Sequence, residues 1–177
     1  MKRILTFLLL LAAVKIFAGE CILSADGKTV TGVKDKNLVT CTIPDGVTVI
    51  GKNAFKDCTK LQKVTLPESV TAIKSYAFAN CSSLQEFKIP PRVKELDERA
   101  FSACGLTSIV IPDGVTLIGI NTFWGCRSLK KVVIPESVEE ICYGAFWSCE
   151  SLKEVLLPAN AEVDYYAFPY HCKKTVR

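Results

Sequence analysis

The side chains best suited to chemistry in this 177-residue chain are nine cysteines and a single histidine. Six of the cysteines recur at separations of 23, 23, 22, 23 and 23 residues: Cys58, Cys81, Cys104, Cys126, Cys149 and Cys172. A tetrahedral metal site needs ligands that converge on one point, whereas a constant spacing strings side chains along an axis. We therefore expect buried structural thiols, each a small apolar group with a weak S–H donor, and no metal or other cofactor.

Nucleophilic catalysis requires a base that is held against the nucleophile in a shaped pocket. The single histidine, His171, precedes Cys172 of the regular series, and we interpret it as a partly exposed terminal residue. The adjacent acids Glu139 and Glu140 are interpreted as solvated surface charge. The glycines stand singly at turns and form no phosphate-binding loop. The sequence predicts a protein without enzymatic activity.

The cysteine spacing is the period of most of the chain. Cutting before each Ile/Leu-Pro pair gives copies at 43–65, 66–88, 89–110, 111–133 and 134–156, followed by a degenerate copy at 157–177. The third copy is one residue shorter than the others, and the shared pattern is I-P-x-x-V-x-x-I-x-x-x-A-F-x-x-C-x-x-L-x-x-V-x. Self-similarity at such a period indicates a solenoid.

The apolar positions of one copy fit neither a single amphipathic helix nor a single strand. Leu84-x-x-Phe87-x-Ile89 alternates at its end and predicts a short strand that Pro90 terminates. Val93-x-x-Leu96 predicts a second apolar step on the opposite side of the coil, and the Ala-Phe stretch predicts one helical turn. Equivalent strands should stack in parallel, about 4.8 Å apart. We predict a short, curved, right-handed solenoid of about six turns that is rich in β-structure.

The Ile/Leu-Pro, Ala-Phe and Cys of each copy resemble the leucine-rich repeats of the BspA-like family, over about residues 29–172. Members are known from surface proteins of anaerobic bacteria, spirochaetes and trichomonads. The resemblance implies a leucine-rich-repeat coil with five repeats over 43–156 and an adhesin-like role in protein binding. It implies host extracellular-matrix or other cell-surface proteins as partners. The alternative is a periplasmic or envelope scaffold that binds a protein of the same cell.

Residues 1–19 have the features of an export signal, with a basic start and a nearly unbroken apolar run from Ile4 to Val14. Cleavage is expected after Ala18 or Gly19, which predicts a secreted or cell-surface protein, with the periplasm as an alternative. A lipid on Cys21 and an uncleaved anchor remain open, although Glu20 stands where a lipoprotein signal requires a small residue. Without a lipid on Cys21 we expect no contact with a membrane.

Removal of residues 1–19 also changes the net charge. This segment carries three basic residues and no acid, so the formal charge falls from +4 to about +1. The remaining chain lacks the basic footprint of a nucleic-acid-binding protein.

Residues 20–42 are expected to cap the solenoid, because an open end exposes a sheet edge that can pair with other chains. Three cysteines lie outside the regular series. Cys21 and Cys41 are the one disulfide pair that we consider, since it would fasten the cap. Cys142 is expected to be a free thiol at a position that faces water.

Two columns of side chains are candidates for partner binding. On the concave sheet, the residue before each Ile/Leu-Pro gives an apolar strip of Val110, Val133 and Leu156, with Lys131 beside it. The second column follows the Ala/Thr-Phe pair and contains both tryptophans, Trp124 and Trp147. These six residues are the predicted binding site. The alternative for the tryptophans is that they stack on each other and cover the core.

Overall fold

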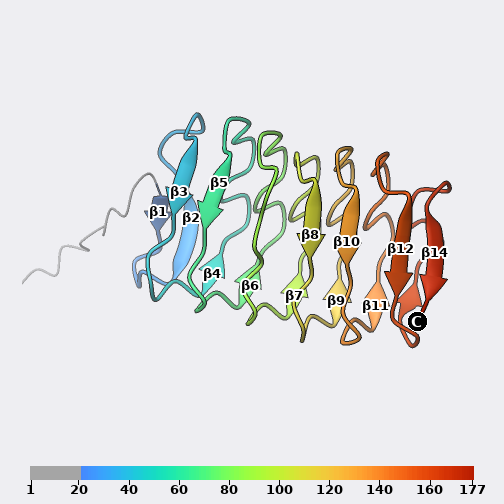
Figure 1. Cartoon of the computed structure of the whole chain (residues 1–177). Coiled ribbons are helices and arrows are strands. Elements are labelled where there is room, and N and C mark those ends of the chain that lie inside the picture. Colours follow the sequence, from blue (N-terminus) through green and yellow to red (C-terminus); the bar gives the residue numbers. More distant parts are fainter. Residues whose placement is uncertain (1–20) are drawn as a thin grey trace, which may run out of the picture.

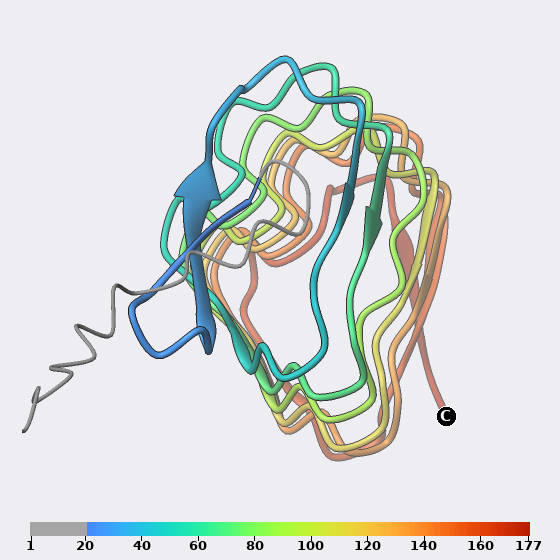
Figure 2. The same ribbon diagram turned by 90° about the vertical axis from the view of Figure 1, so that its left-hand side faces the viewer.

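The computed structural model describes residues 21–177 and confirms the predicted solenoid of parallel turns (Figure 1). One side of the coil is a single eight-stranded sheet, and the other side carries three separate two-stranded sheets. Viewed along the axis, the turns superpose closely (Figure 2).

The eight-stranded sheet contains, in order, β1 (Cys21–Leu23), β2 (Thr29–Val33), β4 (Val49–Ile50), β6 (Ala72–Ile73), β7 (Glu95–Leu96), β9 (Leu117–Ile118), β11 (Glu140–Ile141) and β13 (Glu162–Val163). The two-stranded sheets pair β3 (Thr40–Thr42) with β5 (Lys63–Thr65), β8 (Ser108–Val110) with β10 (Lys131–Val133), and β12 (Glu154–Leu157) with β14 (Lys173–Val176).

The core is organised around a column of stacked phenylalanines, one from each turn. The six rings are at most 1% exposed, and successive centroids lie 4.9–5.4 Å apart with interplanar angles of 5–8°. They are Phe55, Phe78, Phe101, Phe123, Phe146 and Phe168. Each ring therefore loses its contact with water only because the neighbouring turns cover it.

The helical turn predicted at the Ala-Phe stretch is wrong. Among residues 21–177 this part of every copy consists of hydrogen-bonded turns. In the first copy Asn53 and Asp57 have φ angles of 60° and 65°, which are incompatible with a right-handed helix. In this stretch every second backbone N–H donates to a carbonyl of the next turn of the solenoid, as from Phe55 N to Ala77 O (2.7 Å). The N–H groups between them donate within the same copy and close tight backbone turns, as from Lys56 N to Asn53 O (3.1 Å). Hydrogen bonds between turns thus replace those of a helix.

The strand predicted over Leu84–Ile89 is also wrong, because this segment forms no ladder with β5 or β8. Its Phe87 stands where most other copies carry valine, and the ring wedges edge-on between Phe78 and Phe101, at 4.9 Å from each centroid. The following copy is also one residue short. The large ring and the shortened turn together displace this segment, so that no continuous ladder runs from β5 to β8 on this side of the coil.

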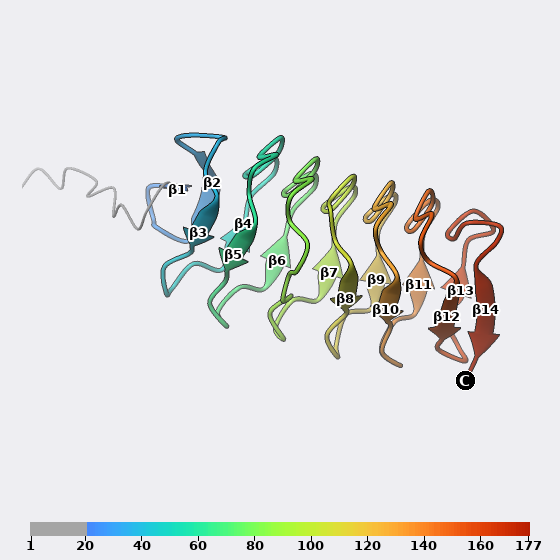
Figure 3. The same cartoon turned by 45° about the horizontal axis from the view of Figure 1, so that its top comes forward.

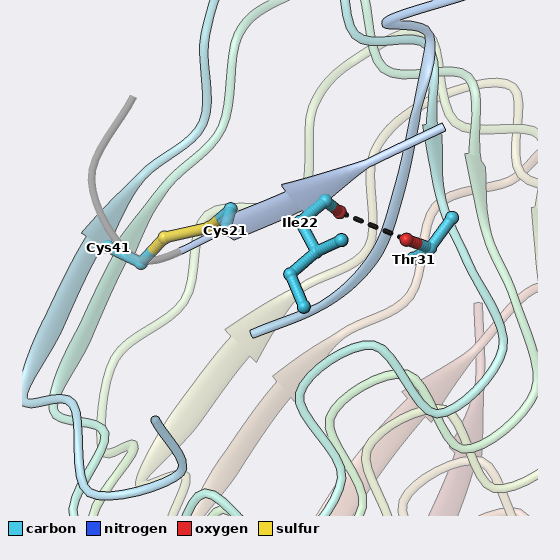
Figure 4. The surroundings of a disulfide bond; sticks show 4 residues. All are labelled: Cys21, Ile22, Thr31 and Cys41. Carbon is cyan, nitrogen blue, oxygen red and sulfur yellow. Dashed lines mark hydrogen bonds between the residues drawn. A yellow bond between two sulfur atoms is a disulfide. The ribbon is translucent and has the colours of Figure 1, made fainter. Parts of the chain in front are cut away.

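At the N-terminal end, β1 runs antiparallel to β2 and covers the edge of the eight-stranded sheet. The disulfide between Cys21 and Cys41 joins this hairpin to β3 (Figure 4) and is the pair that the sequence suggested. Within the hairpin, Thr31 Oγ1 donates to Ile22 O at 3.2 Å. The hairpin protects a sheet edge that would otherwise be open to other chains.

The export signal predicted over residues 1–19 lies outside the described residues and stays a prediction. Within 21–177, no helix has the length and apolar character needed to cross a membrane.

Truncation of a ring in the middle of the phenylalanine column should destabilise the whole solenoid. We expect Phe101→Ala to lower the free energy of unfolding by about 3–5 kcal/mol, because the stacked neighbours on both sides cannot close the cavity. Urea unfolding measures this change. The control Ile120→Ala, at a position that is 47% exposed, should cost no more than about 0.5 kcal/mol. A decrease in the free energy of unfolding of less than about 1 kcal/mol for Phe101→Ala would contradict a stabilising role of the phenylalanine column.

Candidate functional site

The cysteine column has a structural role that its geometry explains. Four of the buried thiols donate to the carbonyl oxygen of a phenylalanine in the preceding turn, over Sγ–O distances of 3.0–3.3 Å. The pairs are Cys81 with Phe55, Cys104 with Phe78, Cys126 with Phe101 and Cys149 with Phe123. Each of these carbonyls already accepts a backbone N–H within its own turn, as Phe55 O does from Cys58 N at 3.1 Å. A small side chain with a weak donor is suited to this site, because it adds a second hydrogen bond to a buried carbonyl.

The same burial makes these thiols poor nucleophiles. Desolvation raises the pKa of Cys58 and of Cys126 to about 12, and it raises the pKa of Cys104 and Cys149 as well. The thiolate is the reactive form of cysteine, so a buried neutral thiol is inert.

The isolated groups also fail to form a catalytic or metal-binding arrangement. His171 is exposed, and among residues 21–177 no hydrogen bond joins it to a thiol or hydroxyl. No group of three His, Cys, Asp or Glu side chains in this part of the chain could hold a metal ion. Cys142 is a free, half-buried thiol, and its Sγ lies 3.3 Å from Glu140 Oε1. Burial, and then Glu140, raises the pKa of Cys142 to about 11.

The two tryptophans do not stack on each other. Trp124 is 43% exposed on the turn side of the coil. Trp147, in the equivalent position of the next turn, is half-buried and packs edge-on against Tyr166 and Tyr170, with centroids 5.9 and 4.9 Å away. Trp147 is therefore part of a larger group of rings.

That group includes four tyrosines of the last two turns, all of which are exposed. Their exposed fractions are 54% for Tyr143, 73% for Tyr165, 41% for Tyr166 and 68% for Tyr170. Tyr143 contacts Tyr166 at 5.7 Å, and Tyr165, Tyr166 and Tyr170 contact one another at 4.9–6.4 Å. Loss of hydration, and then the neighbouring phenols, raises the pKa of Tyr170.

We call this surface the aromatic edge and define it by Ile120, Trp124, Tyr143, Trp147, Tyr165, Tyr166 and Tyr170. The turns that carry it stand in a row, as the view tilted toward the reader shows (Figure 3). In each regular copy, two residues that flank the Ala/Thr-Phe pair have positive φ, for example Asn121 (55°) and Gly125 (70°) in the fourth copy. These bends repeat from turn to turn and point the side chains between them into aligned columns. Backbone geometry thus places the rings of successive copies side by side.

Sequence reasoning selected the tryptophans of this edge and missed its tyrosines. The available signal was that four of the five tyrosines of the chain fall within residues 143–170. Tyr143 and Tyr165 precede Ala145 and Ala167 by the same two positions, so they occupy one column.

A hollow of about 340 Å³ lies beside Trp124, between the third and fourth turns. It results from the missing residue of the third copy. Gly105 follows Cys104 directly there, and a Cβ on this glycine would collide with the carbonyl oxygen of Ser82. Arg127 forms another wall, and its Nε lies 3.3 Å from Glu150 Oε1.

The predicted apolar strip lies on strands β8, β10 and β12 of the two-stranded sheets, apart from the turns that carry the aromatic edge. Val110 and Val133 are direct neighbours in the β8–β10 ladder and are 61% and 38% exposed. Leu156 is 46% exposed but belongs to the separate β12–β14 pair, and Lys131 is exposed at the start of β10. A groove of about 1510 Å³ adjoins Val110 where the ladder is interrupted. The strip therefore extends over two separately hydrogen-bonded pairs of strands that lie next to each other.

These features define a leucine-rich-repeat solenoid with an exposed aromatic and apolar surface. A family model described as BspA type leucine rich repeat region matches in six copies, over residues 33–103 and 48–175. The chain belongs to this family. A comparison with curated proteins gives no match.

Solved structures of bacterial leucine-rich repeat proteins are similar to this one. A protein from Bacteroides ovatus has 31% identity and a TM-score of 0.77, over 84% of this chain and 40% of that one. The T. pallidum leucine rich repeat protein has 35% identity and a TM-score of 0.72, over 80% of this chain and 70% of that one. The pneumococcal vaccine antigen PcpA shares the fold at 23% identity, with a TM-score of 0.75 over 88% of this chain and 40% of its own. The chain thus spans less than half of the Bacteroides and pneumococcal structures.

The buried thiols should make the protein sensitive to alkaline pH. The pKa of Cys126 is raised from 9.0 to about 12 on folding, so its contribution to stability is complete below pH 9 and is lost as the pH rises toward 12. In Cys126→Ser the hydroxyl keeps a donor for Phe101 O but does not titrate. Above pH 9 the free energy of unfolding of the wild type should fall more steeply than that of the variant, by up to about 1.4 kcal/mol per pH unit. Parallel slopes in urea titrations at several pH values would contradict the burial of a neutral thiol.

Proposed function

We propose that this chain is an exported, non-enzymatic protein-binding module that acts at the cell surface or outside the cell. Its partners are host extracellular-matrix or other cell-surface proteins, and it binds them through the aromatic edge. Membership in a repeat family whose folds generally mediate protein interactions supports this role.

The observation that carries the proposal is the concentration of exposed rings on the last three turns. Trp124, Tyr143, Tyr165 and Tyr170 are between 43% and 73% exposed and lie on one side of a rigid coil. Contiguous apolar surface on a monomer marks an interaction site, and tryptophan and tyrosine are enriched among residues that dominate binding energies. Rings held by a stacked backbone lose little conformational entropy on binding, which favours affinity.

The strip of Val110, Val133, Leu156 and Lys131 is proposed as a secondary contact. Val110 and Val133 project from paired strands and are exposed although they are large and apolar. The strip is smaller than the aromatic edge and carries no aromatic ring, so we assign it the weaker contribution.

Export rests on the signal predicted over residues 1–19. The disulfide between Cys21 and Cys41 supports an oxidising destination, because such bonds persist outside the cytosol. A sulfur atom that is bonded to Cys41 cannot also carry a thioether-linked lipid. The pairing therefore favours soluble export over a lipid anchor on Cys21.

Protease shaving of intact cells tests the location. Peptides from residues 110–156 should appear among those released and identified by mass spectrometry, because surface exposure is required for contact with host proteins. Digestion of the protein only after the envelope has been opened would contradict the surface location and would direct attention to partners within the same cell.

A panel of purified matrix and cell-surface proteins on a biosensor tests the binding function. We expect one or more to bind the wild type and to bind Trp124→Ser/Trp147→Ser at least about tenfold more weakly, since ring truncation at a hot spot has effects of this size. Val39→Ser is the matched control, because Val39 is 46% exposed but lies far along the coil in the N-terminal cap region. Thermal melts confirm that each variant is folded. Equal affinity for the double variant and the wild type would overturn the role of the aromatic edge.

A further inference from the structure

The aromatic edge lies in the most acidic part of the molecule. Residues 139–172 contain six carboxylates and one lysine, which gives a formal net charge of −5 with His171 neutral. Residues 21–138 carry fifteen basic and eleven acidic side chains and are therefore net positive. An excess of negative over positive charge is thus found on the same turns that expose the tyrosines.

Three of these carboxylates adjoin the rings. Glu140 and Glu162 are exposed and directly opposite each other in the parallel β11–β13 ladder. Glu140 is three residues before Tyr143, and Asp164 directly precedes Tyr165 and accepts the N–H of Tyr166 at 2.8 Å. None of the three forms an ion pair among residues 21–177. Like charges directly opposite in a ladder repel each other, and a cation bound from outside would relieve this repulsion.

The second turn shows how a cation interacts with a ring on this side of the coil. Lys56 Nζ lies 5.4 Å and Arg99 Cζ lies 5.6 Å from the ring centroid of Tyr76. Arg99 Nη1 also donates to the Tyr76 hydroxyl, at 3.0 Å. The chain itself therefore supplies cations to its N-terminal tyrosine, in an arrangement that is attractive because the face of an aromatic ring is electron-rich.

The last turns keep the rings but lack the cations. The column of Lys56 holds Trp147 in the fifth copy, and the column of Arg99 holds Gly144 there. Within 21–177 no lysine or arginine lies over the rings of Tyr143, Tyr165 or Tyr170. The basic residues that follow, on β14, pair in register with β12 on the other side of the coil.

We propose that the last two turns bind a lysine- or arginine-rich segment of a partner protein. Its cations lie over the exposed rings of Tyr143, Tyr165 and Tyr170 and are neutralised by the carboxylates of Glu140, Glu162 and Asp164. Rings and carboxylates extend over two adjacent turns, so a segment with several cations fits better than a single ion. This inference rests on the proposed function and specifies the chemistry of its partner.

The test uses three fluorescent decapeptides: alternating lysine and glycine, the same peptide with acetylated lysines, and alternating glutamate and glycine. Fluorescence anisotropy with the full exported chain measures their affinities. The lysine peptide should bind, and acetylation should weaken binding at least about tenfold, because it removes the charge on which both interactions depend. Raising the salt from about 0.05 to about 0.5 M should also weaken it, since exposed charges are screened. Equal binding of the acetylated peptide, or no binding of the lysine peptide, would overturn the proposal.

Variants locate the site. Glu140→Gln/Glu162→Gln preserves the shape of the side chains and should lower the affinity for the lysine peptide about tenfold or more, because it removes the attraction between charges. Tyr165→Ser/Tyr170→Ser should lower the affinity to the same extent, because it removes the cation–π contacts. The matched control is Glu68→Gln, since Glu68 is exposed away from the edge and pairs with Lys88 at 3.3 Å. Wild-type affinity in Glu140→Gln/Glu162→Gln would place the peptide elsewhere and reject the site.

Competition separates this inference from the function on which it rests. A protein partner that needs Trp124 and Trp147 but is not displaced by the lysine peptide would leave the binding function standing and reject the basic segment. A partner whose affinity is unchanged both by Trp124→Ser/Trp147→Ser and by Tyr165→Ser/Tyr170→Ser would reject the aromatic edge and the basic segment together.

Discussion

Ring stacking and backbone hydrogen bonding act at the same residue in this solenoid, and each turn depends on the next for both. The N–H of each of the first five phenylalanines in the column donates to the carbonyl of the residue before the next phenylalanine, as from Phe78 to Ala100 and from Phe123 to Ala145, at 2.8 Å. The ring of the same residue stacks on the next ring. A turn that lost its neighbour would expose an aromatic ring and orphan several polar backbone groups together, which makes the turns cooperative.

This dependence restricts the residue types that can occupy the inward positions and the two positive-φ positions beside each Ala/Thr-Phe pair. It places no such restriction on the residues of the outward columns. The same backbone carries Lys56 and Arg99 near its N-terminal end and, in the same two columns, Trp147 and Tyr166 near the other end. Side chains of very different chemistry therefore occupy equivalent places without a change in the core. Function in such a protein is decided by the outward columns, whereas the stacked interior supplies their rigidity.

The sequence was sufficient to predict what repeats. The period and the buried cysteine column followed from spacing and composition, whereas Cys21–Cys41 was the one disulfide pair that the sequence suggested and left open. The helical turn was wrong because a positive φ at residues such as Tyr76 (60°) leaves no mark on a pattern of apolar positions. The interruption at Phe87 depended on how one large ring packs between two others. Three of the four tyrosines of the aromatic edge lie in the sixth copy, which departs from the repeat and was therefore not aligned with the others, although the spacing of Tyr143 and Tyr165 before Ala145 and Ala167 already places these two in one column.

The tyrosines could be explained as a lid on the open C-terminal end of the coil, but their exposure argues against this. The end is closed by other groups: Phe168 and Pro169 are buried, β14 pairs with β12, and Arg177 donates to the carbonyl of Ile134 and pairs with Glu136 at 2.9 Å. Tyr165 and Tyr170, at 73% and 68% exposed, shield little of the core from water. Rings that pack mainly on one another, cover little of the interior and lie beside carboxylates without counter-ions keep a large surface open for contact with another molecule.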